Sequence, residues 1–185
     1  MKKIRVLFYV IAGIFLILGV SLYIFIQNSA TDYNFEIFSS EIGSDVRIVF
    51  DDMAVPHIYA ESETDAMFAL GYVHASERLW QMDLLRRAGG GELSELLGAD
   101  MIENDRYLRT LGMRNAAIKD AAEFENTSSE KTKSAALAYL AGLNTFIGEE
   151  NHPVEYLLLG ATPQKFTTVD MYKVAGFMAY SFAIH

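Results

Sequence analysis

Four side chains that could do chemistry stand close together on one expected helix. His74, Glu77, Arg78 and Gln81 lie within "GYVHASERLWQMDLLRR", which is followed after one residue by three glycines. Glu77 and Arg78 could form a catalytic pair, because buried charges often mark functional sites. A structural network is the favoured interpretation, since the five donors of a guanidinium can hold neighbouring loops together.

The usual signatures of nucleophilic, metal and phosphate sites are missing. His57, His74, His152 and His185 show no ligand spacing. For His57 and His74 we expect hydrogen-bonded, partly buried imidazoles rather than catalysis. The sequence has no Gly-x-Ser-x-Gly and no His-Glu-x-x-His. The glycines at 89–91 lack a phosphate-loop motif around them, so we expect a helix cap and a tight turn.

Two further features of the same stretch have structural interpretations. Asp83 and Arg87 stand four residues apart, which is the spacing of an ion pair on a helix surface. Trp80 is the only tryptophan, and we expect it to fill apolar core. Neither feature requires a catalytic role.

Local patterns predict the elements that position these residues. "VRIVFDD" alternates apolar and polar residues and predicts a strand, and "MAVPHIYAES" predicts a turn into a second short strand. Ser62 and Asp65 have the spacing of a helix cap, so a long helix is expected from Glu63 to Arg87.

Further helices are expected along the rest of the chain. They cover 92–98 as a short helix or turn, 101–124 with a break near Gly112, 128–150 after a serine cap, and 167–185, with a compact connection at 153–166. Residues 174–184 are apolar on every side and too few to span a bilayer, so we expect them in a protein interior. The sequence stops within this helix, and we therefore expect the domain to be incomplete at its C-terminus.

A long apolar segment occupies the N-terminus. Residues 6–26 carry no charge, and as a helix they would be about 30 Å long, the thickness of a bilayer's hydrocarbon core. Lys2, Lys3 and Arg5 precede the segment, which predicts a cytoplasmic N-terminus and an exported remainder. Cleaved signal peptides usually have a shorter apolar region, so an uncleaved anchor is favoured and cleavage is the alternative.

We therefore predict a membrane anchor at 1–27 with a transmembrane segment at 6–26, a linker at 28–45, and a folded region at 46–185. Three of the 15 basic residues precede the apolar segment and all 24 acidic residues follow it, so the exported part is strongly acidic. Nucleic-acid binding needs a basic surface, and we expect no nucleic-acid partner. The absence of cysteine excludes a disulfide framework.

An ordered series of short motifs runs from about Val46 to the end. It comprises Pro56-His57-Ile58, Gly71-Tyr72, Arg78-Leu79, Gln81-Met82, Arg86-Arg87 and Glu95-Leu96-Leu97-Gly98, then "DRYLR", "LAGLNTFI" and "PQKFTTVDMYKVAGFMAYSF". In this order they resemble the α-subunit region of the penicillin acylase family. Phe50, Ala54 and Glu77 depart from the family's Arg, Gly and Asp.

The resemblance implies an α+β, mainly helical fold. It would be the α-subunit part of the four-layer αββα sandwich of N-terminal-nucleophile hydrolases, preceded here by a transmembrane helix. Within such a sandwich Arg78 and Gln81 would be structural clamps. The implied activity is hydrolysis of linear amide bonds in acyl-amine compounds, such as β-lactam side chains or acyl-homoserine lactones, with a link to antibiotic metabolism.

The resemblance also implies that the catalytic groups lie outside residues 1–185. The family's nucleophile is a serine at the start of a downstream β-subunit, with its own amine as base. No catalytic or metal-binding residue is thus expected in this chain, which alone should be inactive. Calcium is expected in the complete enzyme, with an α-side glutamate shortly after His185. The implied partners are the β-subunit of the same precursor, a small-molecule acyl amide, and the membrane.

Two substrate-binding residues are implied on the last expected helix. Met178 and Phe182 match apolar residues of the family's acyl pocket, and their i,i+4 spacing puts them on one helix face. An apolar core stripe is the alternative, and Ser181 stands where some members carry a pocket-closing Arg. The domain is expected on the periplasmic or extracellular side. The alternative function is a membrane-tethered binding or sensor module without catalysis.

Overall fold

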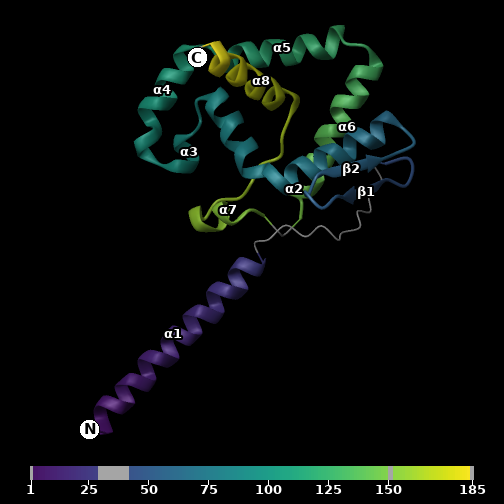
Figure 1. Ribbon diagram of the computed structural model, residues 1–185. Coiled ribbons are helices and arrows are strands. Elements are labelled where there is room, and N and C mark those ends of the chain that lie inside the picture. Colours follow the sequence, from purple (N-terminus) through teal and green to yellow (C-terminus); the bar gives the residue numbers. More distant parts are fainter. Residues whose placement is uncertain (1, 29–41, 150–151, 184–185) are drawn as a thin grey trace. The chain divides into compact units, whose positions relative to one another are not determined.

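The computed structural model describes residues 2–28, 42–149 and 152–183, in two compact units, Met1–Asn34 and Phe35–His185. Helix α1 (Lys2–Asn28) makes up the described part of the first unit (Figure 1). Its stretch Arg5–Phe25 is long and apolar enough to cross a membrane. A signal peptide near an N-terminus has the same properties, so α1 is compatible with either role. Most of the predicted linker, 29–41, lies outside the described residues.

A β-hairpin opens the described part of the second unit. Strand β1 (Arg47–Phe50) pairs antiparallel with β2 (Pro56–Tyr59), and the side chains of β1 alternate between exposed and half-buried, as the sequence predicted. In the turn, the Asp51 carboxylate accepts hydrogen bonds from two backbone amides at 2.9 Å. Ala54 has φ 58°, which lies in the left-handed region that a residue with a side chain rarely adopts.

The long helix α2 (Glu63–Gly90) begins and ends at the predicted signals. Ser62 caps it, because its Oγ accepts a hydrogen bond from the Asp65 amide at 3.0 Å. Gly91 ends it in the left-handed conformation with φ 64°, which confirms a glycine cap, although Gly89 and Gly90 are still helical and α2 runs three residues past the predicted end at Arg87. The backbone of Arg78 leaves helical geometry (φ −141°, ψ 20°), and the sequence did not predict this kink.

Further helices follow within the described residues. They are α3 (Ser94–Leu97), the 3₁₀ helix η1 (Ala99–Met101), α4 (Ile102–Thr110), α5 (Met113–Thr127), α6 (Glu130–Ile147), α7 (Val154–Leu159) and α8 (Thr168–Ala183). Gly112, with φ 74°, makes the predicted break between α4 and α5. The predicted serine cap of α6 is Ser129, whose Oγ accepts from the Thr132 amide at 3.2 Å. Helix α7 is a short turn of helix within the predicted connection.

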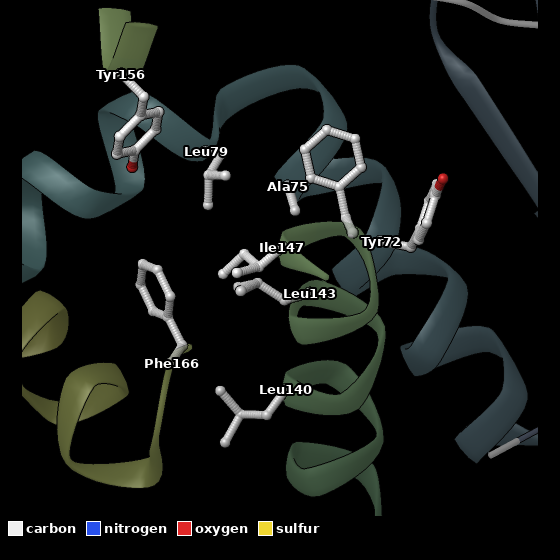
Figure 2. Packing of buried hydrophobic residues seen from close by; sticks show 9 residues of the cluster. Tyr72, Ala75, Leu79, Leu140, Leu143, Ile147, Tyr156 and Phe166 are labelled. Atoms are coloured by element: carbon white, nitrogen blue, oxygen red, sulfur yellow. The ribbon is translucent and has the colours of Figure 1, made fainter. Parts of the chain in front are cut away.

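The apolar core lies between α2 and α6 and is closed by α7 and the segment before α8. Its buried members are Tyr72, Ala75, Leu79, Leu140, Leu143, Phe146, Ile147, Tyr156 and Phe166. Figure 2 shows the residues of α2 and α6 on facing sides of this cluster. Trp80 packs against it, edge-to-face on Tyr156 at 5.2 Å between ring centroids, so its predicted core role is confirmed.

Glycines set the close approach of α2 to its neighbours. A Cβ atom on Gly71 would overlap the carbonyl of Tyr139 in α6, and one on Gly142 would overlap the carbonyl of Phe68 in α2. Helix α2 therefore packs backbone against backbone on α6. At its other end, a Cβ on Gly89 would overlap the Lys173 carbonyl, so α8 contacts α2 there in the same way (Figure 1).

The fold class is confirmed in part. The described residues are mainly helical, and their sheet structure is the one hairpin, so the four-layer sandwich is not formed by these residues alone. The expected burial of the helix at 174–184 is wrong for the described part of that segment. Met178 and Phe182 are 43% and 77% exposed, because no described element covers their face of α8.

Substitution of the glycines at the α2–α6 contact tests this packing. Gly71→Ala and Gly142→Ala should each destabilise the fold by about 1–3 kcal/mol, since the added methyl group forces the two backbones apart. Gly176→Ala is the matched control, because α8 leaves open space around this residue. It should be neutral or stabilising by up to about 1 kcal/mol. Thermal unfolding followed by circular dichroism measures the difference, and equal melting temperatures for all three variants would refute the packing.

Candidate functional site

The two residues implied in substrate binding lie on the exposed C-terminal half of α8. Met178 and Phe182 are one helical turn apart, so they share a face. Between them, Ser181 donates a hydrogen bond from its Oγ to the Met178 carbonyl at 2.8 Å, so its hydroxyl is engaged within the helix. This face can offer apolar contact to a bound acyl chain.

Charged groups hold the N-terminal half of α8. Asp170 lies in the first turn of the helix and reaches back to the residue before it: its Oδ2 accepts from the Thr167 amide at 2.9 Å and from the Thr167 hydroxyl at 2.7 Å. Its Oδ1 accepts from Lys173 Nζ at 3.2 Å, and Lys173 also donates to Glu92 Oε2 at 3.1 Å. The buried residues of α8 are Asp170 and Lys173. Ion pairs therefore join this helix to the loop that follows α2.

A second charged cluster is buried near the C-terminal end of α2. Asp83 is 0% exposed. Its Oδ1 accepts from Arg86 Nε at 2.6 Å and from Arg87 Nε at 3.1 Å, and its Oδ2 accepts from the Tyr156 hydroxyl at 2.9 Å. The predicted i,i+4 ion pair between Asp83 and Arg87 is thus confirmed, but its predicted place on the helix surface is wrong, because both side chains are buried. Tyr156 of α7 thus contacts this side of α2 and is itself buried beside the carboxylate.

Arg86 connects the two clusters. Its guanidinium donates to the Lys165 carbonyl at 3.2 Å and lies 3.8 Å from Asp170 Oδ2. The same group stacks over the Phe166 ring, 4.1 Å from its centroid. Arg86 thereby ties the end of α2 to the segment that leads into α8. The Asp83 and Asp170 clusters form one charge network through this side chain.

Burial and charge shift the acid–base behaviour of the network in opposite directions. Burial opposes ionisation of Asp170, but the two Thr167 hydrogen bonds and the charges of Lys173 and Arg86 outweigh it, so the pKa of Asp170 lies below its ordinary value. Burial, reinforced by the adjacent Asp83 charge, raises the pKa of Tyr156 above its ordinary value. Tyr156 therefore stays protonated and donates its hydrogen bond across the physiological range.

The polar residues from which the sequence analysis started lie apart from this network. Glu77, Arg78 and Gln81 are exposed, and the structure gives none of them a hydrogen bond or ion pair with another described residue. The clamp role of Arg78 and Gln81 therefore stays a prediction. His74 Nδ1 lies 3.0 Å from the Tyr139 hydroxyl, and burial together with the Arg78 charge lowers the pKa of His74.

The other sequence-predicted groups give no catalytic arrangement among the described residues. His57 Nε2 lies 3.2 Å from Asp51 Oδ2, which confirms the expected hydrogen bond, but the expected partial burial is wrong because the His57 side chain is 49% exposed. Across the described part of the chain, no group of three or more His, Cys, Asp or Glu side chains is placed to hold a metal ion. The calcium expected in a complete enzyme stays a prediction.

The contribution of Asp170 can be measured by substitution. Asp170→Asn should lower stability at pH 7 by about 3 kcal/mol, because it leaves Lys173 and Arg86 less compensated in a buried site. The folded-state pKa is depressed below 3.8. The charge therefore contributes fully well above pH 3.8, and the difference from the parent should shrink as the pH falls through the folded-state pKa.

The control is Glu103→Gln, which removes an exposed ion pair with Arg106 and should change stability by less than about 1 kcal/mol. Melting temperatures of the three proteins between pH 7 and pH 3 provide the measurement. A stability difference for Asp170→Asn that grew with acidity would refute the sign of the pKa shift.

Comparisons with known proteins place the chain in a family. The family model for penicillin amidase matches residues 45–185. The chain is 43% identical over 124 residues to penicillin acylase 2 proenzyme from Pseudomonas sp. (strain SE83), covering 66% of this chain and 16% of that protein. It is 37% identical over 106 residues to acyl-homoserine lactone acylase QuiP from Pseudomonas fluorescens (strain Pf0-1), covering 57% of this chain and 12% of that protein.

The fold is also similar to that of a solved acylase. The thermostable penicillin G acylase from Alcaligenes faecalis aligns with a TM-score of 0.66 at 25% identity, over 76% of this chain and 75% of that chain. This chain therefore belongs to the penicillin amidase family. It spans less than a fifth of the length of the curated relatives described above.

Proposed function

We propose that this chain is the N-terminal, α-subunit part of an amidohydrolase that cleaves linear amide bonds of acyl-amine compounds. Membership of the penicillin amidase family carries the proposal. Relatives are named penicillin acylase and acyl-homoserine lactone acylase, so the substrate class is β-lactam side chains, acyl-homoserine lactones or similar acyl amides. A role in antibiotic metabolism fits the first of these substrates.

The role of this chain within that enzyme is to contribute apolar contact to the acyl group. The exposed pair Met178 and Phe182 supports this role, because large apolar side chains that lack a covering element are suited to contact a ligand or another protein segment. The nucleophilic serine, its amine and the oxyanion donors are proposed to come from a downstream β-part of the same precursor. Calcium is proposed to bind only in that complete protein.

We further propose that α1 anchors the protein and that the second unit lies outside the cytoplasm. The apolar stretch of α1 is long enough to span a bilayer. The basic residues at 2, 3 and 5 favour a cytoplasmic N-terminus.

Amine release tests the enzymatic proposal. Residues 28–185 expressed alone should release no amine from an N-acyl-homoserine lactone or an acylated β-lactam. The same residues expressed with the segment that follows in the reading frame should do so, because the nucleophile is expected there. Hydrolysis by residues 28–185 alone would refute the assigned mechanism. Absence of hydrolysis by the longer protein, with binding of acyl amides retained, would favour a non-catalytic binding module.

The acyl contact is tested in the active protein. Phe182→Ala should reduce kcat/KM for aromatic acyl groups roughly tenfold more than for short ones, because the truncated side chain loses apolar contact with the longer group. Leu137→Ala, at an exposed leucine of α6, is the control and should leave the ratio unchanged. Equal losses for all acyl groups together with a lower melting temperature would show that Phe182 is a packing residue.

Membrane topology is tested in spheroplasts, which are cells whose outer barrier has been removed and whose inner membrane is intact. Protease added to spheroplasts should digest the second unit and spare α1, since the flanking charges predict export of everything after the apolar stretch. Lysed spheroplasts and a cytoplasmic marker protein serve as controls. Full protection of the second unit until lysis would overturn the assigned topology.

A further inference from the structure

We propose that Lys173 is a positioning residue for the acyl-binding face of α8. Its buried ammonium group sets the direction of the helix and thereby the place at which Phe182 meets the acyl chain. This inference rests on the proposed function, since it assigns the cause of acyl-chain selectivity at the same site.

The Lys173 ammonium lies between two carboxylates from different parts of the chain. Its Nζ is 3.1 Å from Glu92 Oε2 and 3.2 Å from Asp170 Oδ1, and the Lys173 side chain is only 11% exposed. Glu92 follows the glycine cap of α2, whereas Asp170 lies in the first turn of α8 itself. The ammonium therefore holds α8 at a defined angle to the end of α2. Such a buried pair is costly to break because one partner would keep an uncompensated charge.

Close to this ion pair, the backbone of α8 contacts the backbone of α2. The Lys173 carbonyl lies against Gly89, where no side chain keeps the two helices apart. This backbone contact fixes the point at which α8 approaches α2 most closely, and the ion pair lies beside it. The buried side chains of α8 are Asp170 and Lys173 themselves. The buried ion pairs therefore help to set the angle of α8, together with Met171, which is partly buried and packs against the core between α2 and α6.

Helix α8 also contacts α5 and α4 along its length. Tyr172 meets the ring of Phe124 edge-on at 6.3 Å between centroids. Tyr180 shares a hydrogen bond of 2.9 Å with the exposed hydroxyl of Tyr107. Two arginines flank the carboxylates that hold the ammonium. Arg114 Nε lies 3.5 Å from Glu92 Oε1, and the Arg86 guanidinium lies 3.8 Å from Asp170 Oδ2. These contacts restrain α8 along its side, whereas Lys173 joins its second turn to Glu92 after α2.

A small tilt of α8 at Lys173 produces a large displacement at the acyl-binding face. Phe182 is nine residues beyond Lys173, which corresponds to about 13 Å along an α-helix. A tilt of the helix axis by about 10° at Lys173 would move the Phe182 position by about 2 Å. Displacements of this size at substrate-contacting groups are large enough to change rates strongly. Lys173 thus controls acyl selectivity without touching the substrate.

The test combines a distance measurement with kinetics in the full-length protein. The chain contains no cysteine, so Leu137→Cys and Ala183→Cys provide spin-label sites on α6 and at the end of α8. In this background Lys173→Met should broaden or shift the inter-label distance distribution by about 2 Å, whereas Lys173→Arg should keep it narrow because it preserves both ion pairs. Glu92→Gln removes one partner charge and should give an intermediate broadening even if Lys173→Met folds poorly.

In the active protein without labels, Lys173→Met should change the ratio of kcat/KM for aromatic over short acyl groups about fivefold, mainly through KM, with recovery in Lys173→Arg. Arg106→Met, which breaks an exposed ion pair, is the control for both readouts. A lower melting temperature with an unchanged distance distribution would overturn the proposal, as would a shifted distribution with unchanged selectivity. Altered α8 geometry in a protein that hydrolyses no acyl amide would instead refute the proposed function.

Discussion

The fully buried carboxylate of Asp83 is the constraint on which the arrangement of the second unit depends. An ionised group without access to water is tolerated only where hydrogen bonds and opposite charges surround it. Arg86, Arg87 and Tyr156 supply them together. The end of α2 and helix α7 must therefore be in place at the same time. Apolar contact between α2 and α6 supplies the hydrophobic driving force, and the carboxylate favours one arrangement of the surrounding elements.

The same network divides α8 into two parts with different roles. Its first turns are fixed by Asp170 and Lys173, which are buried, whereas Met178 and Phe182 stand on an uncovered face. A rigid base and an exposed apolar end suit a helix that presents side chains to a ligand or to another protein segment. The fixed base explains how residues at the tip can be placed reproducibly although no described element packs over them.

Much of the fold could be predicted from the sequence because its signals are local. The cap at Ser62, the turn at Gly91 and the break at Gly112 each depend on residues within one helical turn. The burial of Asp83 could not be predicted, since its partner Tyr156 is 73 positions away. Residues 174–184 were expected in an interior because they are apolar on every side. Composition alone does not reveal whether a neighbouring element covers them. The pair Met178 and Phe182 came from family resemblance, since an apolar i,i+4 pair is equally typical of a core helix.

The central claim is that α8 presents its exposed face to the acyl group of an amide substrate. Photo-crosslinking with an N-acyl amide that carries a diazirine in its acyl chain tests this most directly, when the complete active protein is irradiated and the labelled peptides are mapped by mass spectrometry. The account predicts labels on α8 at or next to Met178 and Phe182, suppressed by excess unlabelled acyl amide. Labels that are suppressed by the competitor but lie only on other elements, with α8 unmodified, would contradict it.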